Sequence, residues 1–463
     1  MKNINNFFLG LALIVLVGQT LVAQQIKPFK EGDRAVFLGN SITDGGHYHS
    51  FVWLYYMTRF PDMNLRILNA GIGGDTAYDM YKRLDGDVFS KRPSVLMVTF
   101  GMNDSGYYEY NQEGQDDFGD KKYQECLDNY QKLEKRLQGL ENTRIVLMGT
   151  SPYDETVQIK KNTPLRGKNE TIERIVEFQK KSAENNNWEF TDFCQPMTEI
   201  NESGQLKDSS FTICGSDRIH PDNDGHMVMA YLFLKAQGFV GKEVAEIEID
   251  ANKKKTLKSI NCDISDIKRI KDDLSFSYLA NSLPYPLDTV PRGWGSEKSQ
   301  AGAMSIVPFM EEMNREILKI SGLKGEYKLL IDNEEIGAWT GAELAKGINL
   351  AEQTKTPQYQ QALAIMHLNE VRWEIERVFR EYAWMEFGFL QGKGLLFADN
   401  REAIEMIDEN LDNGWVRGRR DMYSKMMFPE FREAREAEID LLISKIYEIN
   451  KPLKRNIVLR KVL

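Results

Sequence analysis

The chain has 463 residues, of which 42% are hydrophobic and 28% are charged. This length and composition predict a globular protein of two or three domains with a sizeable buried core. Its formal net charge of -10 would repel phosphate backbones and gain little from an anionic membrane, so we expect no nucleic-acid partner and, once the N-terminal signal is cleaved, no stable membrane insertion.

Residues 1–24 have the pattern of a secretory signal peptide. Lys2 gives a basic start, residues 7–17 are apolar, and small or neutral residues lead to Ala23 and Gln24. The apolar stretch is shorter than the roughly 20 residues that a membrane-spanning helix needs, although a permanent N-terminal anchor is the alternative. We therefore predict export to the periplasm or the extracellular space.

Short apolar runs alternate with longer amphipathic stretches between residues 34 and 238. The expected strands are 34–39, 65–71, 94–101, 144–150 and 189–192, and the expected helices are 48–60, 77–90, 119–138, 169–186 and 223–237. This rhythm is typical of βαβ units. It predicts a doubly wound, flavodoxin-like α/β domain with a mostly parallel sheet of about five strands, which we place at residues 25–242.

The pattern changes in residues 243–463, where we expect a β segment followed by a mainly helical region. Alternating runs at 245–250 and 274–279 predict strands, and 326–339 predicts a hairpin centred on Asp332 and Asn333. Apolar residues at helical spacing then predict packing faces, namely Leu368, Val371, Ile375, Val378, Tyr382 and Met385. The role of this region is left open between walling the active site, binding a glycan and dimerisation.

Ser41, in "GNSIT", follows the first expected strand and precedes a helix. Chemistry in parallel sheets collects at the carboxyl ends of the strands, so this position suits a nucleophile. The alternative is that Ser41 is the N-cap of the next helix.

A nucleophilic serine needs a base to accept its proton, and His220 is the candidate. It stands in "SDRIHPDNDGH", three residues after Asp217 and directly before Pro221, which favours an extended loop. On such a loop Asp217 can orient the imidazole and stabilise its charged form. The alternative is an ordinary helix-capping loop.

Two further segments offer donors for an oxyanion, as acyl transfer requires. The stretch "NAGIGGDT" at 69–76 supplies backbone N–H groups in a glycine-rich turn, and "FGMND" at 100–104 supplies the Asn103 amide. Each also occurs as an ordinary loop feature. The ordered combination of all four segments after successive strands is what indicates an active site.

These four segments resemble the conserved blocks of the SGNH hydrolases, or GDSL-type esterases, over roughly residues 33–238. The resemblance implies Ser41 as nucleophile, His220 as general base and then acid, and Asp217 as its orienter. It implies an oxyanion hole of the Ser41 N–H, the Gly74 N–H and the Asn103 amide. It also implies hydrolysis of acyl esters without a metal, and we expect no cofactor.

Asn40 departs from that family pattern, which usually has aspartate before the serine. Asparagine keeps a hydrogen-bonding oxygen but loses the charge. We expect this side chain to buttress the loop, so that activity survives the change.

The substrate is expected to be an O-acetyl ester on a carbohydrate. The stretch 104–123 beside the expected cleft is polar, and no amphipathic lid for lipid is visible in the first 240 residues. A lipid or short-chain acyl esterase, an acyltransferase and a glycan-binding protein on the same fold remain alternatives.

Several other residues are candidates for the cleft. His47, His49, Tyr107, Tyr108 and Tyr110 are candidates for lining the pocket. The segment 283–295, rich in proline, glycine and aromatics, is either an ordered loop across the cleft or a plain connector.

The four cysteines show no Cys-x-x-Cys pair, so no thiol-redox motif is visible. Cys194 and Cys214 either form a disulfide or are buried as small hydrophobic residues.

Overall fold

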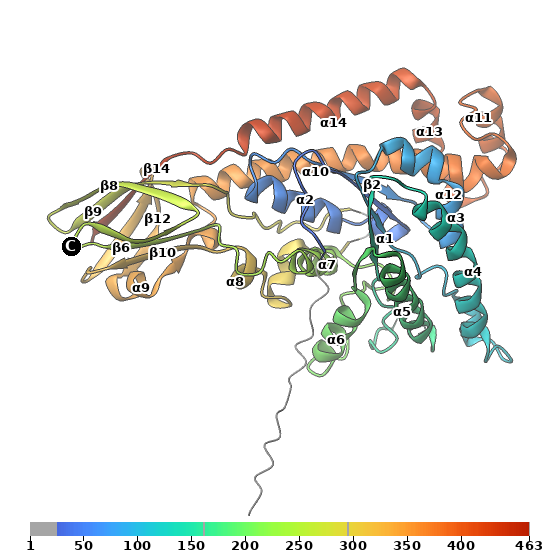
Figure 1. Cartoon of the computed structure of the whole chain (residues 1–463), viewed down its shortest axis with the longest axis horizontal. Helices are drawn as coiled ribbons and strands as arrows, with labels where there is room; N and C mark the ends of the chain where they lie inside the picture. The colour runs from blue at the N-terminus through green and yellow to red at the C-terminus, as the bar shows by residue number, and fades with distance from the viewer. Residues whose placement is uncertain (1–25, 161–162, 294–295, 463) are drawn as a thin grey trace, which may run out of the picture.

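The computed structural model describes residues 26–160, 163–293 and 296–462 (Figure 1). The predicted signal peptide lies outside these residues. Within the described ranges, no helix combines the length and apolar character needed to cross a bilayer.

The first half of the chain forms a five-stranded parallel sheet in the order β2-β1-β3-β4-β5. This is the predicted flavodoxin-like order, and the fold class is confirmed. The strands are β1 (Arg34–Gly39), β2 (Arg66–Gly71), β3 (Val95–Val98), β4 (Arg144–Met148) and β5 (Glu189–Thr191). Their side chains are almost wholly buried, as expected for a sheet covered by helices on both faces.

The five predicted helices of this half match the observed ranges closely except at 77–90, and the structure adds two helices that were not predicted, at Ser41–Asp44 and Cys194–Gln205. The helices of this half are α1 (Ser41–Asp44), α2 (Tyr48–Arg59), α3 (Ala77–Lys82), α4 (Phe118–Gln138), α5 (Lys168–Asn186), α6 (Cys194–Gln205) and α7 (Asn223–Ala236). The predicted helix at 77–90 ends as an α-helix at Lys82 and continues as a π-helix and a 3₁₀ turn. At this change of winding lies the buried Arg83, whose guanidinium pairs with Asp75 at 2.6 Å and with Asp87.

A β-sandwich follows, built from two sheets that share one hydrophobic core. The first has the order β13-β10-β6-β7 and the second β12-β11-β14-β9-β8. The strands are β6 (Ala245–Asp250), β7 (Lys255–Ile260), β8 (Cys262–Ile270), β9 (Asp273–Ala280), β10 (Glu316–Ser321), β11 (Glu326–Ile331), β12 (Glu334–Thr340), β13 (Ile348–Asn349) and β14 (Arg455–Lys461). The hairpin at 326–339 is confirmed, and β14 returns from the chain's end to pair between β9 and β11.

The C-terminal helices leave this sandwich and run back along the α/β half (Figure 1). They are α10 (Pro357–Ala383), α11 (Arg401–Asp408), α12 (Gly414–Arg417), α13 (Arg420–Met426) and α14 (Pro429–Ile449). Two shorter helices come earlier in the chain: α8 (Phe309–Met313) precedes β10, and α9 (Gly341–Lys346) packs on β10. With 27 residues, α10 is roughly 40 Å long.

The main hydrophobic core extends across the predicted boundary at residue 242. Ala362, Ile365 and Met366 of α10 and Ile443 and Ile446 of α14 belong to the same cluster as the sheet residues. The boundary itself stays a prediction, but the two sides share one interior.

All four cysteines are buried and free. Cys194 and Cys214 therefore form no disulfide, and the second reading of this pair, as small buried residues, is correct.

Candidate active site

Ser41 begins α1 directly after β1, and Asn40 rather than Ser41 caps that helix. The Asn40 Oδ1 accepts a hydrogen bond of 3.0 Å from the Ile42 N–H. Since the cap is supplied by its neighbour, the Ser41 hydroxyl is available for another partner. That partner is His220, whose Nε2 lies 2.8 Å from the Ser41 Oγ.

His220 is fixed by Asp217 on the same loop. The His220 Nδ1 and the Asp217 Oδ2 are 2.5 Å apart, and the backbone N–H groups of Ile219 and His220 donate to the other carboxylate oxygen at 2.9 Å. Burial raises the pKa of the Asp217 carboxyl, but these bonds and the nearby imidazole outweigh it and leave that pKa below its usual value. Asp217 is therefore held as a carboxylate that can orient the ring.

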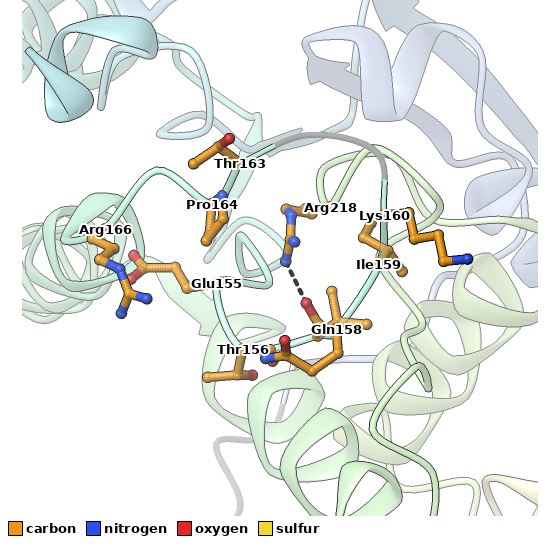
Figure 2. Close-up of a pocket in the computed structure, with 10 residues that line it drawn as sticks. Glu155, Thr156, Gln158, Ile159, Lys160, Thr163, Pro164, Arg166 and Arg218 are labelled. Atoms are coloured by element: carbon orange, nitrogen blue, oxygen red, sulfur yellow. Dashed lines mark hydrogen bonds between the residues drawn. The ribbon is translucent and has the colours of Figure 1, made fainter.

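Arg218 anchors the loop that carries this pair. Its Nη1 donates to the backbone oxygens of Asp154 at 3.0 Å and Val157 at 2.8 Å. Figure 2 shows the guanidinium pointing toward this segment, at the edge of a cavity of about 500 Å³. The loop is thus held to the 154–157 segment by the Arg218 side chain.

The glycine-rich turn after β2 packs against the serine. A Cβ built on Gly73 would lie 3.9 Å from the Ser41 Cβ, and the Gly73 N–H donates to the Asp44 Oδ2 at 3.2 Å. Gly74 has a φ of +92°, in the left-handed region that favours glycine.

Asn103 is tied to the same turn. Its Nδ2 donates to the Asp75 backbone oxygen at 2.8 Å, and its Oδ1 accepts from the Tyr107 hydroxyl at 2.6 Å. One N–H of the amide is used by Asp75, so the second remains as a donor. Tyr107, predicted only as a candidate for lining the pocket, therefore orients the predicted oxyanion donor.

A small cavity of about 20 Å³ lies beside Ser41 and His220. Arg292 and Ser296 also line it, so the described part of the 283–295 segment reaches the site rather than merely connecting domains. The Arg292 N–H is held by the Asn223 side chain at 2.6 Å.

The prediction that His47 and His49 line this pocket was wrong. Both are buried where α2 packs into the core. The ring of His47 stacks on Trp373 with centroids 3.8 Å apart, and His49 Nε2 lies 3.1 Å from the Thr43 backbone oxygen. Burial lowers the pKa of His49 to about 4, so its ring is neutral near pH 7.

Comparison with known proteins places this arrangement in context. Residues 37–228 match the GDSL-like lipase/acylhydrolase family, and residues 363–451 match the diltiazem deacetylase C-terminal helical domain. The solved structure of BT4096, a gut microbial diltiazem-metabolizing enzyme, is 70% identical, has a TM-score of 0.94, and is aligned over 95% of this chain and 100% of its own. The chain belongs to the GDSL-like lipase/acylhydrolase family.

As a member of this family, the chain is a carboxylic ester hydrolase. A more distant relative is the acetylxylan esterase of Geobacillus stearothermophilus, which is 27% identical over 225 residues. That alignment covers 45% of this chain and 95% of the relative.

Sequence reasoning missed the polar face of α10, which is buried against this acylhydrolase half. Asn369 Nδ2 donates to the Ser50 Oγ at 2.9 Å, and Glu370 Oε2 lies 3.2 Å from the His47 Nε2. Trp373 Nε1 donates to the Gly46 backbone oxygen at 3.3 Å. The apolar stripe suggested one packing face, yet Val371 in that stripe is 43% exposed while the polar face is covered.

Lys168 was also missed, although it lies beneath the Asn103 loop. Its Nζ donates to the backbone oxygens of Met102 at 2.7 Å and Gly106 at 2.5 Å and to the Ser105 Oγ at 2.6 Å. The Nζ also lies 4.0 Å from the centroid of the Tyr107 ring. Burial lowers the pKa of Lys168 to about 7, although Asp104 and Glu155 oppose that shift. One lysine at the start of a helix gave no signal of this role.

Proposed function

We propose that this chain hydrolyses acetyl esters of carbohydrates by a Ser-His-Asp mechanism. The observation that carries the proposal is the continuous contact from the Ser41 Oγ to His220 Nε2 and from His220 Nδ1 to Asp217. A serine hydroxyl is a poor nucleophile until such a base accepts its proton.

The reaction follows from this geometry in two halves. The Ser41 Oγ attacks the acetyl carbonyl carbon while His220 takes its proton, and Asp217 stabilises the imidazolium. The negative oxygen of the tetrahedral intermediate accepts hydrogen bonds from the Ser41 N–H, the Gly74 N–H and the Asn103 amide. The bond between the carbonyl carbon and the sugar oxygen then breaks as His220 protonates that oxygen, which leaves an acetyl ester on the Ser41 Oγ. A water molecule, deprotonated by the same ring, attacks this ester, and His220 returns the proton to the Ser41 Oγ as acetate leaves.

The size of the cavity beside Ser41 supports acetyl as the acyl group. A volume of about 20 Å³ is close to the space that one water molecule needs, and this small size favours a short acyl group such as acetyl. The acetylxylan esterase and the deacetylase named above also share the acetyl group and differ in the alcohol.

A second candidate is an acetyl ester of a small non-carbohydrate alcohol. The 70% identity to a diltiazem-metabolizing enzyme favours it. The two candidates share the chemistry at Ser41 and differ only in what binds outside it.

We also propose that the protein is exported. The basic start, the apolar stretch at 7–17 and the small residues before Gln24 support this. N-terminal sequencing of the protein from its host's secreted fraction would test the predicted cleavage.

A substrate panel tests the proposed reaction. Purified wild type is given acetylated xylo-oligosaccharide, diltiazem and the 4-nitrophenyl esters of acetate, butyrate and octanoate, with folded Ser41→Ala as the control. We expect acetate to be preferred over octanoate by about 100-fold or more, and Ser41→Ala to lose about 10⁴-fold or more in kcat. Preference for octanoate, or unchanged turnover in Ser41→Ala, would contradict the proposal. The ratio of kcat/KM for the sugar ester to that for diltiazem decides between the two alcohols.

A further inference from the structure

Side chains of α10 and of the π-helix Trp384–Leu390 that continues it bind the outer edge of β2 and the oxyanion turn that follows it. The Glu376 Oε1 accepts from the Asn69 N–H at 2.8 Å, and the Arg380 Nε donates to the Gly71 backbone oxygen at 2.9 Å. One turn further on, the Trp384 Nε1 donates to the Gly73 backbone oxygen at 3.2 Å. Because β2 is an edge strand, these groups have no neighbouring strand to bind.

The spacing of these contacts explains why one continuous helical segment can make all three. Glu376, Arg380 and Trp384 are four residues apart, which is about 6 Å along a helix. Alternate residues of an extended chain are about 6.6 Å apart and point to the same side. Side chains of this helical segment therefore supply hydrogen-bond partners along the edge up to Gly73, where a sheet interior would have a neighbouring strand.

The last contact bears directly on Gly74. The Gly73 carbonyl and the Gly74 N–H belong to one planar trans peptide unit, so they point in opposite directions. Fixing the carbonyl fixes the N–H. We propose that Trp384 is a positioning residue for the reaction, because its indole N–H holds the Gly73 carbonyl and so aims the Gly74 N–H at the oxyanion.

The surroundings of Trp384 support a fixed indole. The Arg419 guanidinium lies 4.6 Å from its ring centroid, and the Trp415 ring stacks at 6.4 Å. Behind it, Arg380 binds both oxygens of the buried Asp87 at 2.7 and 2.8 Å. Trp384 and Gly74 also line one cavity of about 230 Å³, so the indole and the turn face the same space.

This inference rests on the proposed function, and its test uses a substrate pair that reports on hydrogen bonds to the oxyanion. Trp384→Phe keeps an aromatic ring and removes the N–H. The pair is 4-nitrophenyl acetate and the thiono analogue in which sulfur replaces the carbonyl oxygen, since sulfur is a weak acceptor. We expect Trp384→Phe to lower kcat for the acetate about tenfold with KM within twofold, less than the 10²–10³ for removing a donor outright. The ratio of kcat for the acetate to kcat for the thionoacetate should fall by a similar factor.

Trp415→Phe is the matched control. It makes the same change in the ring that stacks on Trp384, and the Trp384 N–H that binds Gly73 stays in place. We expect its kcat and its acetate-to-thionoacetate ratio to stay within twofold of wild type. An unchanged ratio in Trp384→Phe, even with lower activity, would overturn the positioning role. Wild type without activity on nitrophenyl acetate would instead defeat the proposed function, so the two failures are distinct.

Discussion

The two proposed oxyanion donors that lie outside α1 are held by different parts of the chain. The Asn103 loop is supported from within the α/β half, by Lys168 and Tyr107. The Gly74 turn is supported by Trp384, which begins the π-helix that continues α10 and lies 311 positions away from Gly73. A site that resembles a self-contained catalytic domain in sequence thus depends on both halves of the protein.

The chemistry of the two supports also differs. Lys168 is a single buried cation whose pKa is lowered to about 7, so its charge changes near neutral pH. Behind the Gly74 turn, burial raises the pKa of Asp87, but Arg380, Lys91 and Arg83 outweigh it and hold that pKa well below its usual value. Lys168 therefore changes charge near neutral pH, whereas Asp87 stays charged there. Asp75, which follows Gly74 and accepts a hydrogen bond from Arg83, is a second group that titrates near neutrality, because burial raises its pKa to about 7.

Removing the C-terminal half should have the largest effect. A chain ending at Lys242 loses the α10 and α14 residues of the main core and leaves the edge of β2 without partners. We expect it to be insoluble or unfolded, as measured by soluble yield and far-UV circular dichroism. Full-length Ser41→Ala, expressed in parallel, should be soluble and folded.

A soluble truncated chain that unfolds cooperatively and hydrolyses nitrophenyl acetate at the wild-type rate would contradict this expectation. It would mean that the α/β half positions Gly74 without α10.

Replacing Lys168 by Met should weaken the other support. The change removes three hydrogen bonds to the 102–106 loop while keeping a long side chain. We expect kcat for the acetate to fall about 10- to 100-fold, because the Asn103 amide loses its fixed direction. Steady-state kinetics measure this, with circular dichroism to show that the variant is folded.

The pH dependence of kcat distinguishes the loss of the Lys168 hydrogen bonds from a general disturbance of the fold. Below about pH 7 the ammonium offers three N–H donors, and above it the amine offers two, so the loop loses one donor as pH rises. Asp104, Glu155, Tyr107 and Tyr153 face this amine and act on its charge. We expect the ratio of wild-type kcat to that of Lys168→Met to fall about fivefold as pH rises through 7. A ratio that is constant from pH 6 to 8.5 would contradict this role.

The same group predicts a change in stability with pH. The folded state binds fewer protons than the unfolded state between about pH 7 and the ordinary lysine pKa of 10.5. The free energy of unfolding contributed by Lys168 should therefore rise with pH in that window and be level below it. Lys168→Met lacks this rise.

Much of the α/β half was predictable because its signals are local. The apolar runs and glycine breaks place all five strands within a few residues of their true ends. Three of the site segments directly follow β1, β2 and β3, whereas His220 lies on the loop between α6 and α7, where it meets Ser41. The resemblance to a known family added the roles of Gly74 and Asn103.

The supports were not predictable because their signals are not local. Glu376 and Arg380 read as the solvated face of an amphipathic helix, and only the tertiary partners Asn69, Gly71 and Asp87 make their burial possible. Lys168 likewise reads as an exposed residue at the start of a helix, yet its side chain is fully buried. Charged residues are buried only with partners, and the sequence does not name those partners.

The smallest effect is expected at Asn40, which belongs to neither support. Its Oδ1 caps α1, and aspartate caps a helix about as well as asparagine, with its charge favoured at a helix N-terminus. Burial of that charge works in the opposite direction. We expect Asn40→Asp to change kcat/KM for nitrophenyl acetate by no more than about threefold between pH 6 and 8. An increase of 100-fold or more would mean that a carboxylate at this position takes part in the chemistry. Asn40 would then limit the kcat/KM of the wild-type enzyme rather than buttress the loop that carries its nucleophile.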